Sequence, residues 1–196
     1  MLVTVLAVNN YPTRERFLRL EKCVKGNGAA VTSVDWDSVS TAIFDSYDGV
    51  VLSGSPDMMS EERIQAKYRK EMDSILDAKA PLLGVCFGHQ MIASAFGSQV
   101  VDDGRHVLKM VRTEVLADDP LFEGLPKSMM LLESRHEVVK TMPRGFELLA
   151  TSATSRIATM RHRSRALYGV QFHPERFTRE HPDGDRVVGN FVRMLG

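Results

Sequence analysis

The sequence predicts an α/β fold: an open, mostly parallel sheet with helices on both faces and an added antiparallel portion in the C-terminal half. Two observations predict it. In the first half, short apolar runs alternate with segments whose apolar residues recur at helical spacing, and strands joined by helices form parallel sheets with right-handed crossovers. In the second half, apolar runs follow one another with only short turns between them, which favours antiparallel pairing.

The first half supplies the parallel strands. Leu2–Val8 is a short apolar run rich in β-branched residues, which is typical of a strand covered on both faces. The other strands predicted in this half are Ala29–Val34, Gly49–Leu52 and Pro81–Val85.

Helices are predicted between these strands. Residues 13–25 carry apolar side chains at helical spacing. Ser60 can cap a second helix, whose first turn holds Glu61 and Glu62 at the favourable positive end of the helix dipole. The apolar face of this helix comprises Ile64, Tyr68, Met72, Ile75 and Leu76. A third helix follows Val85 and carries Met91, Ile92, Ala95 and Phe96.

The second half is predicted to be mostly strands, closed by one helix at Arg186–Leu195. No repeat, low-complexity tract or Pro/Gly/Ser-rich linker divides the sequence, so residues 1–196 are expected to form a single domain. The predicted strands are Val107–Leu116, Ser128–Leu132, Phe146–Ala150, Ile157–Met160 and Ala166–Gln171.

Composition and charge exclude several classes of function. The 196 residues are 43% hydrophobic, and 25 basic residues balance 25 acidic ones. Nucleic-acid binders normally have a basic excess, so no nucleic-acid partner is expected. No apolar run reaches the roughly 18 residues of a membrane span, and the N-terminus lacks the basic region of a signal peptide. We therefore expect no membrane association and a cytoplasmic location.

Metal and disulfide chemistry are not expected either. The two cysteines, Cys23 and Cys86, are too few for a disulfide framework or a cysteine-rich zinc site. No group of histidines, cysteines and carboxylates has the spacing of metal ligands. The sequence therefore predicts no metal and no cofactor.

The segment LLGVCFGHQ at Leu82–Gln90 places a cysteine between a strand and a helix. Gly84-Val85-Cys86-Phe87-Gly88 has the spacing of a nucleophile elbow, with cysteine in place of serine. Such a turn presents the middle side chain at the end of the strand, and the positive end of the following helix favours the thiolate. A buried core cysteine is compatible with the same spacing, so both interpretations stay open. Cys23 lacks these features and is predicted to be structural.

A nucleophilic cysteine needs a general base, and the base needs an orienting group. His173 is a candidate because it lies at the end of a predicted strand, which Pro174 terminates, and Glu175 can accept a hydrogen bond from the far imidazole nitrogen. His-Pro-Glu also occurs by chance in turns. For other histidines we expect roles outside catalysis. His89 is predicted to support the elbow, His162 to lie in a solvated hairpin loop, and His106 and His181 to be exposed.

Three motifs together resemble the class I (triad) glutamine amidotransferases. They are LSGSP at Leu52–Pro56, GVCFGHQ at Gly84–Gln90 and YGVQFHPE at Tyr168–Glu175, and they span most of the chain in this order. Within the class, the stretch Phe146–Glu175 looks most like the glutaminase portion of GMP synthetase and its free-standing relatives. We therefore expect flavodoxin-like winding, with the site at the carboxyl ends of the strands.

The resemblance implies a Cys86–His173–Glu175 triad that acts on glutamine. Cys86 would attack the side-chain amide carbonyl, and His173 would protonate the leaving ammonia and then activate water. Glu175 would orient the imidazolium, and the γ-glutamyl thioester would be hydrolysed to glutamate. The family's glutamine-holding residue corresponds to Gln90.

The resemblance also implies an oxyanion hole made by the backbone N–H groups of Phe87 and of Ser55 or Gly54. The family usually has Ser-Gly-Gly-Pro where this chain has Ser53-Gly54-Ser55-Pro56. Serine resists positive φ, so we expect Ser55 to restrict this loop, to hold its N–H away from the oxyanion in the free protein and to release it when a partner docks.

A second departure lies in the stretch that the family usually writes Ser-His-Gly-Asp. Here it reads Ser134-Arg135-His136-Glu137. By resemblance, Ser134 and Arg135 are candidate substrate contacts. Arg135 either pairs with the α-carboxylate of glutamine or forms a surface salt bridge with Glu133 or Glu137.

These observations leave three hypotheses for the function. The first is an amidotransferase that releases ammonia for a separate, ATP-dependent synthetase subunit, GMP-synthetase-like; the sequence shows no P-loop or other nucleotide motif. The second is a stand-alone γ-glutamyl hydrolase or peptidase with the same triad and no ammonia transfer. The third, a non-enzymatic relative with a dead site, is disfavoured because Cys86, His173 and Glu175 are all present.

Overall fold

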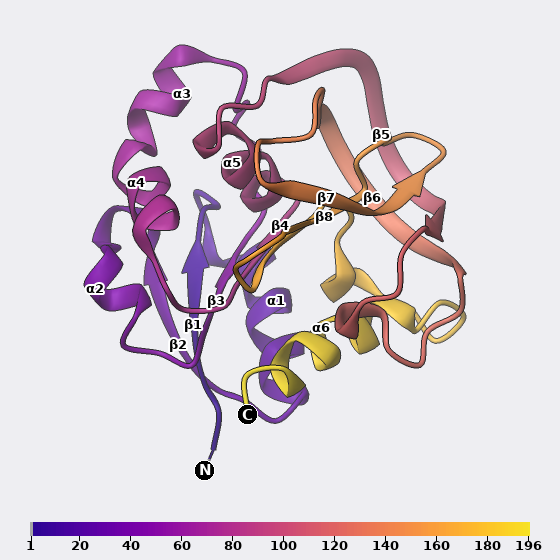
Figure 1. Ribbon diagram of the computed structural model, residues 1–196, viewed down its shortest axis with the longest axis horizontal. Coiled ribbons are helices and arrows are strands. Elements are labelled where there is room, and N and C mark those ends of the chain that lie inside the picture. Colours follow the sequence, from indigo (N-terminus) through magenta and orange to yellow (C-terminus); the bar gives the residue numbers. More distant parts are fainter. Residues whose placement is uncertain (1) are drawn as a thin grey trace.

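A nine-stranded mixed sheet, flanked by helices, forms the centre of the structure, a computed structural model that describes residues 2–196 (Figure 1). The strand order is β2-β1-β3-β4-β9-β8-β7-β5-β6. The strands are β1 Thr4–Asn9, β2 Ala30–Asp35, β3 Gly49–Leu52, β4 Leu82–Val85, β5 Val100–Val115, β6 Ser128–Val139, β7 Phe146–Ser152, β8 Thr159–His162 and β9 Leu167–Val170. The predicted fold class is confirmed.

The helices cover the two faces of the parallel part of the sheet. They are α1 Arg14–Gly26, α2 Thr41–Phe44, α3 Glu62–Lys67, α4 Arg69–Asp77, α5 Phe87–Ala95 and α6 Asp183–Arg193, with 3-10 turns at Trp36–Ser38, Pro120–Phe122 and Pro174–Arg176. Along β1, Leu6 and Val8 pack with α2 to α5, whereas Val5 packs with α1 and α6. This follows from the alternation of side chains along a strand.

Strands β2, β1, β3, β4 and β9 are parallel, so their carboxyl ends lie at one edge. Strands β8, β7, β5 and β6 continue the sheet with antiparallel pairing. Strand β9, the last in sequence, therefore lies beside β4 at the centre, where the two halves meet. Segments that carry the motifs at residues 52–56, 84–90 and 168–175 are brought to one edge in this way.

The helix predicted over residues 60–76 is divided in two. Ser60 does not cap it, because α3 begins only at Glu62 and Glu61 occupies the N-cap position; the Ser60 backbone N–H donates instead to the Glu137 carboxylate at 3.1 Å. Tyr68 separates α3 from α4. Its side chain is fully buried, and its hydroxyl donates to the Asp57 carboxylate at 2.9 Å, with the Asn10 carbonyl oxygen 3.3 Å away as an alternative acceptor for the same proton. The break thus aims a polar group at two loops at the carboxyl edge.

Strands β5 and β6 are longer than predicted. The strand predicted at Val107–Leu116 begins earlier, since β5 starts at Val100 and includes polar residues 102–106, with a register shift between Asp102 and Val107. Within this stretch Asp102 pairs with Glu137, and regular pairing resumes at Val107 opposite Arg135, so residues 103–106 bulge out of the ladder. Among residues 2–196, every helix falls short of the length and apolar character needed to cross a bilayer.

Candidate active site

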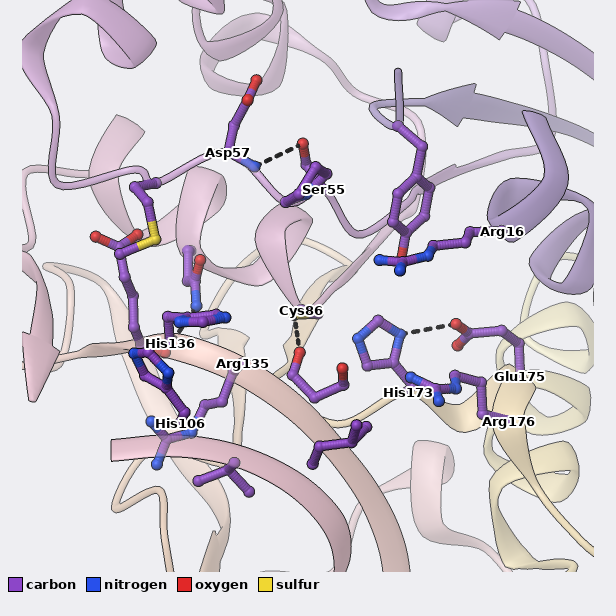
Figure 2. A pocket seen from close by; sticks show the side chains of 18 of the residues that line it. Arg16, Ser55, Asp57, Cys86, His106, Arg135, His136, His173, Glu175 and Arg176 are labelled. Atoms are coloured by element: carbon purple, nitrogen blue, oxygen red, sulfur yellow. Dashed lines mark hydrogen bonds and ion pairs between the residues drawn. The ribbon is translucent and has the colours of Figure 1, made fainter. Parts of the chain in front are cut away.

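The loops after β1, β3, β4 and β9 surround one cavity of about 710 Å³, which β6 closes from the side (Figure 2). Cys86 follows β4, His173 follows β9 and Ser55 follows β3. All three line this cavity. The structure therefore brings together side chains from three widely separated segments of the sequence.

Cys86 occupies the turn from β4 into α5. Its φ of 52° makes it the one non-glycine residue with positive φ among residues 2–196. A Cβ on Gly84 would lie 2.6 Å from the backbone of Gly88, and a Cβ on Gly88 would lie 2.8 Å from the carbonyl oxygen of Leu52. Both glycines of the motif are therefore required by close backbone packing, as predicted from their spacing. The turn holds Cys86 only 4% exposed, at the cavity wall.

The backbone and thiol of Cys86 are held by neighbouring strands. Its N–H donates to the carbonyl of Val170 on β9 at 2.8 Å. Its Sγ lies 3.5 Å from the carbonyl oxygen of Ser134 on β6, and Gln171 Nε2 lies 3.8 Å from the sulfur. As the first residue of α5, Phe87 has a backbone N–H without an acceptor inside the helix.

His173 and Glu175 form a buried pair. Nδ1 of His173 lies 2.8 Å from Oε1 of Glu175, and the imidazole ring lies between Glu175 and Cys86 (Figure 2). Pro174 begins a 3-10 turn that brings Glu175 back to the ring. The His173 N–H donates to the Leu132 carbonyl of β6 at 2.8 Å, which fixes the start of this turn.

The electrostatics of this pair favour an imidazolium. Burial by itself would lower the pKa of His173, but the opposing charges of Glu175 and Cys86 and hydrogen bonds to both outweigh it and raise the pKa to about 10. A thiolate, an imidazolium and a carboxylate in line are the arrangement in which a cysteine acts as a nucleophile. The site is therefore chemically suited to acyl transfer.

The loop Ser53–Asp57 lies against the imidazole. A Cβ on Gly54 would lie 3.0 Å from Cε1 of His173 and 2.5 Å from the Tyr11 hydroxyl. Ser55 does not have positive φ in this conformation, which agrees with the resistance of serine to positive φ; the expected effect of a docking partner on this loop stays a prediction. The Ser55 Oγ accepts a hydrogen bond from the Asp57 N–H at 3.1 Å.

Gln90 and Ser134 also lie at the cavity, but Arg135 does not present a free guanidinium to it. The Arg135 side chain is fully buried and pairs with Glu133 at 3.1 Å and Asp103 at 3.3 Å, and it also donates to the Thr154 carbonyl. The expectation of a surface salt bridge is wrong, since the Glu133 pair has no exposed surface. The position of Arg135 gives no support to a contact with a substrate carboxylate.

The other cysteine and histidines lie apart from this pair. Cys23 is buried on α1 beside Asp185, and burial followed by the Asp185 charge raises its pKa. His89 has no exposed surface, and burial lowers its pKa to about 4. The prediction for His162 is wrong, because it ends β8 and packs on Phe146; His181 is half-buried.

Several residues of the cavity wall were missed by sequence reasoning. His106 is exposed as expected, but its ring lies 4.0 Å from that of His136 at the cavity. Tyr11 lies two residues after β1 ends at Asn9. Because ligands bind at the carboxyl ends of the strands in open α/β sheets, this place in the sequence was a signal that could have identified it. Burial, reinforced by the charges of Cys86 and Glu175, raises the Tyr11 pKa, which keeps the phenol neutral. Arg16, Arg176 and Glu137 also line the cavity.

No group of three or more histidine, cysteine or acidic side chains within residues 2–196 is arranged to hold a metal ion.

A family model and curated relatives both match this chain, and both are glutamine amidotransferases or glutamine-hydrolysing enzymes. The family model described as class I glutamine amidotransferase matches residues 16–194. The A subunit of the glutamine-hydrolysing GMP synthase of Methanopyrus kandleri is 39% identical over 150 residues, and that of Pyrococcus abyssi is 35% identical over 148 residues; each match covers 76% of both chains.

Two solved structures are similar. The A subunit of a GMP synthase from Thermoplasma acidophilum superposes with a TM-score of 0.87 at 27% identity, covering 100% of this chain and 94% of that one. A glutamine amidotransferase from Thermotoga maritima has a TM-score of 0.69 at 21% identity, covering 89% of this chain and 77% of the other. The second likeness shows the fold alone.

The protonation state of His173 is testable by NMR of ¹⁵N-labelled histidine rings. Because the fold raises the pKa to about 10, the ring should remain an imidazolium at pH 7 and lose its proton only as the pH rises toward 10. In Glu175→Gln the carboxylate charge is lost while burial remains, so the pKa should fall toward or below the ordinary value of about 6.5. His89, neutral throughout, serves as the internal control; a neutral His173 ring at pH 7 in the wild type would contradict this electrostatic analysis.

Proposed function

Since the chain belongs to the class I glutamine amidotransferase family, we propose that it hydrolyses the side-chain amide of glutamine through a thioester on Cys86 and supplies the ammonia to a separate synthetase subunit. The observation that carries the proposal is the placement of Cys86 at a strained turn facing the same cavity as the His173–Glu175 pair.

In the first step the Cys86 thiolate attacks the amide carbon of glutamine, and a tetrahedral intermediate forms. The Phe87 N–H at the start of α5 and an N–H of the Gly54–Ser55 segment stabilise its oxyanion; one such donor is worth roughly 3 kcal/mol. The His173 imidazolium gives its proton to the amide nitrogen, the C–N bond breaks, and ammonia leaves. Glu175 holds the ring and supports its charge.

In the second step the neutral imidazole takes a proton from water, and the hydroxide attacks the thioester carbon. Collapse of the second intermediate breaks the C–S bond, which regenerates the thiolate and the imidazolium. Glutamine and water have then become glutamate and ammonia. Gln90 and the backbone of Ser134 lie where they can position the substrate, since Gln90 Nε2 donates to the Glu137 carbonyl at 2.9 Å and Ser134 O contacts Sγ.

The destination of the ammonia is proposed from the relatives. The curated relatives are the A subunits of glutamine-hydrolysing GMP synthases, a name that refers to one subunit of a larger enzyme. We propose that a GMP-synthetase-like, ATP-dependent subunit is the partner here.

The identity of the nucleophile is tested by labelling. A glutamine-mimicking electrophile should modify Cys86 and spare Cys23, because Cys23 is buried beside Asp185 and its raised pKa keeps it a thiol. Cys86→Ala should abolish both labelling and glutamine hydrolysis, whereas Cys23→Ala should retain both. Peptide mass spectrometry identifies the site, and modification of Cys23 alone would refute the assignment.

The roles of His173 and Glu175 are tested by turnover. His173→Ala should lose about 10²–10⁴-fold in kcat, the usual contribution of acid–base catalysis. Glu175→Gln should lose less, because it removes only the orientation and charge support of the ring. His162→Ala, which lies outside the cavity wall, is the control and should be close to wild type; equal turnover in all three variants is inconsistent with the triad.

Coupling to a partner separates the two enzymatic hypotheses. Glutamine hydrolysis should be slow for the isolated chain and should rise when a GMP-synthetase-like subunit, ATP and the nucleotide acceptor are added, because ammonia released without an acceptor is wasted. The measurement is glutamate production with and without these components, with Cys86→Ala as the blank. Rapid hydrolysis that the partner leaves unchanged favours the stand-alone γ-glutamyl hydrolase.

A further inference from the structure

A buried carboxyl group that the proposed mechanism does not use lies behind the loop after β3. Glu71 on α4 has no exposed surface. Its Oε1 accepts a hydrogen bond from Asn10 Nδ2 at 3.3 Å, and no cation pairs with it among residues 2–196. A buried ionised carboxylate without a cation is costly, so this position favours the neutral acid.

The hydrogen-bond inventory of Glu71 and Asn10 supports the same protonation state. Two buried oxygens without a donor, Glu71 Oε2 and Asn10 Oδ1, belong to these two facing side chains. A neutral carboxylic acid has one O–H to donate, which is the donor that this pair lacks. Burial also raises the pKa of Glu71 to about 8, against a smaller lowering effect of the Asn10 hydrogen bond.

From Asn10 the contacts continue to the loop beside the imidazole. The Asn10 N–H donates to the Ser53 hydroxyl at 2.9 Å, and this hydroxyl donates to the carbonyl oxygen of Gly54 at 3.0 Å. Asn10 and Ser53 are almost completely buried, so these hydrogen bonds are shielded from water. Glu71, Asn10 and Ser53 therefore form a continuous relay that ends on one peptide group.

That peptide group joins Gly54 to Ser55, and its orientation matters for the site. In a planar trans peptide the C=O and N–H point in opposite directions. Because the Gly54 carbonyl is held toward the buried Ser53 hydroxyl, the Ser55 N–H is turned away from it, on the side where Ser55 lines the cavity. No acceptor for this N–H is found in the described part of the chain.

We propose that Glu71, as a neutral carboxylic acid, is a positioning residue that acts through Asn10 and Ser53 to keep the Ser55 N–H directed at the oxyanion. The inference rests on the proposed glutaminase function. Ionisation of Glu71 removes the shared proton and leaves a buried charge, so it favours arrangements that release Asn10 and with it the Gly54–Ser55 peptide.

None of the groups that face Glu71 in the described part of the chain changes its charge near neutral pH, so Glu71 is the one residue of this relay that titrates there. Asn10 from the end of β1 and Ser53 from the end of β3 are uncharged. Tyr68, which faces it from the junction of α3 and α4, has a pKa raised by burial and stays neutral. Beyond Tyr68, Asp57 pairs with Lys67 at 2.7 Å. Phe87 packs on the Tyr68 ring from α5.

The test compares Glu71→Gln with Glu71→Met in the full chain. Glutamine keeps a donor and an acceptor for Asn10 at the same size, so Glu71→Gln should retain most of the wild-type kcat. Methionine removes both, so Glu71→Met should lose roughly 10²–10³-fold in kcat, the effect of losing one oxyanion donor, with KM little changed. Above pH 8, kcat of the wild type should fall relative to that of Glu71→Gln.

A second variant and a structural readout keep the test independent of folding and of activity. Ser53→Ala removes the hydroxyl that links Asn10 to Gly54 and should lower kcat to a similar extent. The ¹⁵N shift and hydrogen exchange of the Ser55 amide should change in Ser53→Ala and Glu71→Met but not in Glu71→Gln. Alkylation by iodoacetamide, which needs no oxyanion donor, should modify Cys86 and spare the buried Cys23 in every folded variant, whereas an unfolded variant would be modified at both cysteines.

The relay is overturned if Glu71→Met and Ser53→Ala keep the wild-type kcat and Ser55 amide signal, or if Glu71→Gln is as slow as Glu71→Met. Failure of the proposed function has a different signature. In that case the wild type hydrolyses no glutamine, even with a synthetase subunit present, while the Ser55 amide measurements still decide whether the relay exists.

Discussion

The backbone turn at Cys86 is the constraint on which the rest of the site depends. A non-glycine residue with φ of 52° costs about 1–3 kcal/mol and persists only where the surroundings leave no alternative. Here β3, β4 and β9 impose it together. Gly88 lies against the Leu52 backbone of β3, Gly84 lies against Gly88, and the Cys86 N–H is bound by Val170 of β9. The central parallel strands must therefore be assembled before the thiol can reach its position.

The antiparallel portion of the sheet contributes to the site through one strand. Successive positions of β6 contact the loops after three parallel strands: the Leu132 carbonyl binds the His173 N–H, the Ser134 carbonyl lies at the Cys86 sulfur, and the Glu137 carboxylate binds the N–H groups of Met59 and Ser60. The Glu137 carbonyl also accepts from Gln90. Pairing with β5 along most of its length holds β6 in place, and the buried Arg135–Glu133 pair connects it to the Ser152–Thr154 turn. Strand β6, at the edge of the sheet, therefore helps to position the loops that carry Cys86 and His173 at its centre.

Local patterns account for what could be predicted from the sequence. The alternating strands and helices, the elbow around Cys86 and the His173–Glu175 spacing are each contained in a few consecutive residues, so their geometry follows from local sterics. The contacts that were missed join distant segments. Glu71 meets Asn10 across 61 residues, and Glu137 meets Met59 across 78. Neither partner carries a local signal, and Glu71 is one of several acidic residues on an otherwise ordinary amphipathic helix. The helix break at Tyr68 likewise carries no local signal, and the hydroxyl of this residue contacts loops elsewhere in the chain.

Three of the four buried glutamates around the site, Glu71, Glu133 and Glu175, show why residue type alone does not decide chemistry. Glu133 is paired with the permanently charged guanidinium of Arg135 and accepts from Ser152 and Thr154, so it serves as part of the scaffold. Glu175 faces an imidazole, a group that can lose its proton, and so its charge can stabilise a state that changes during a reaction cycle. Glu71 faces only an amide, and without a cation nearby the neutral form is favoured. A carboxyl group beside a permanent cation therefore has a structural role, as at Glu133. Beside a titratable cation it can take part in catalysis, as at Glu175. Without a cation it can donate a hydrogen bond, as at Glu71. The nearest cationic group, rather than the carboxyl itself, is what differs between these three positions.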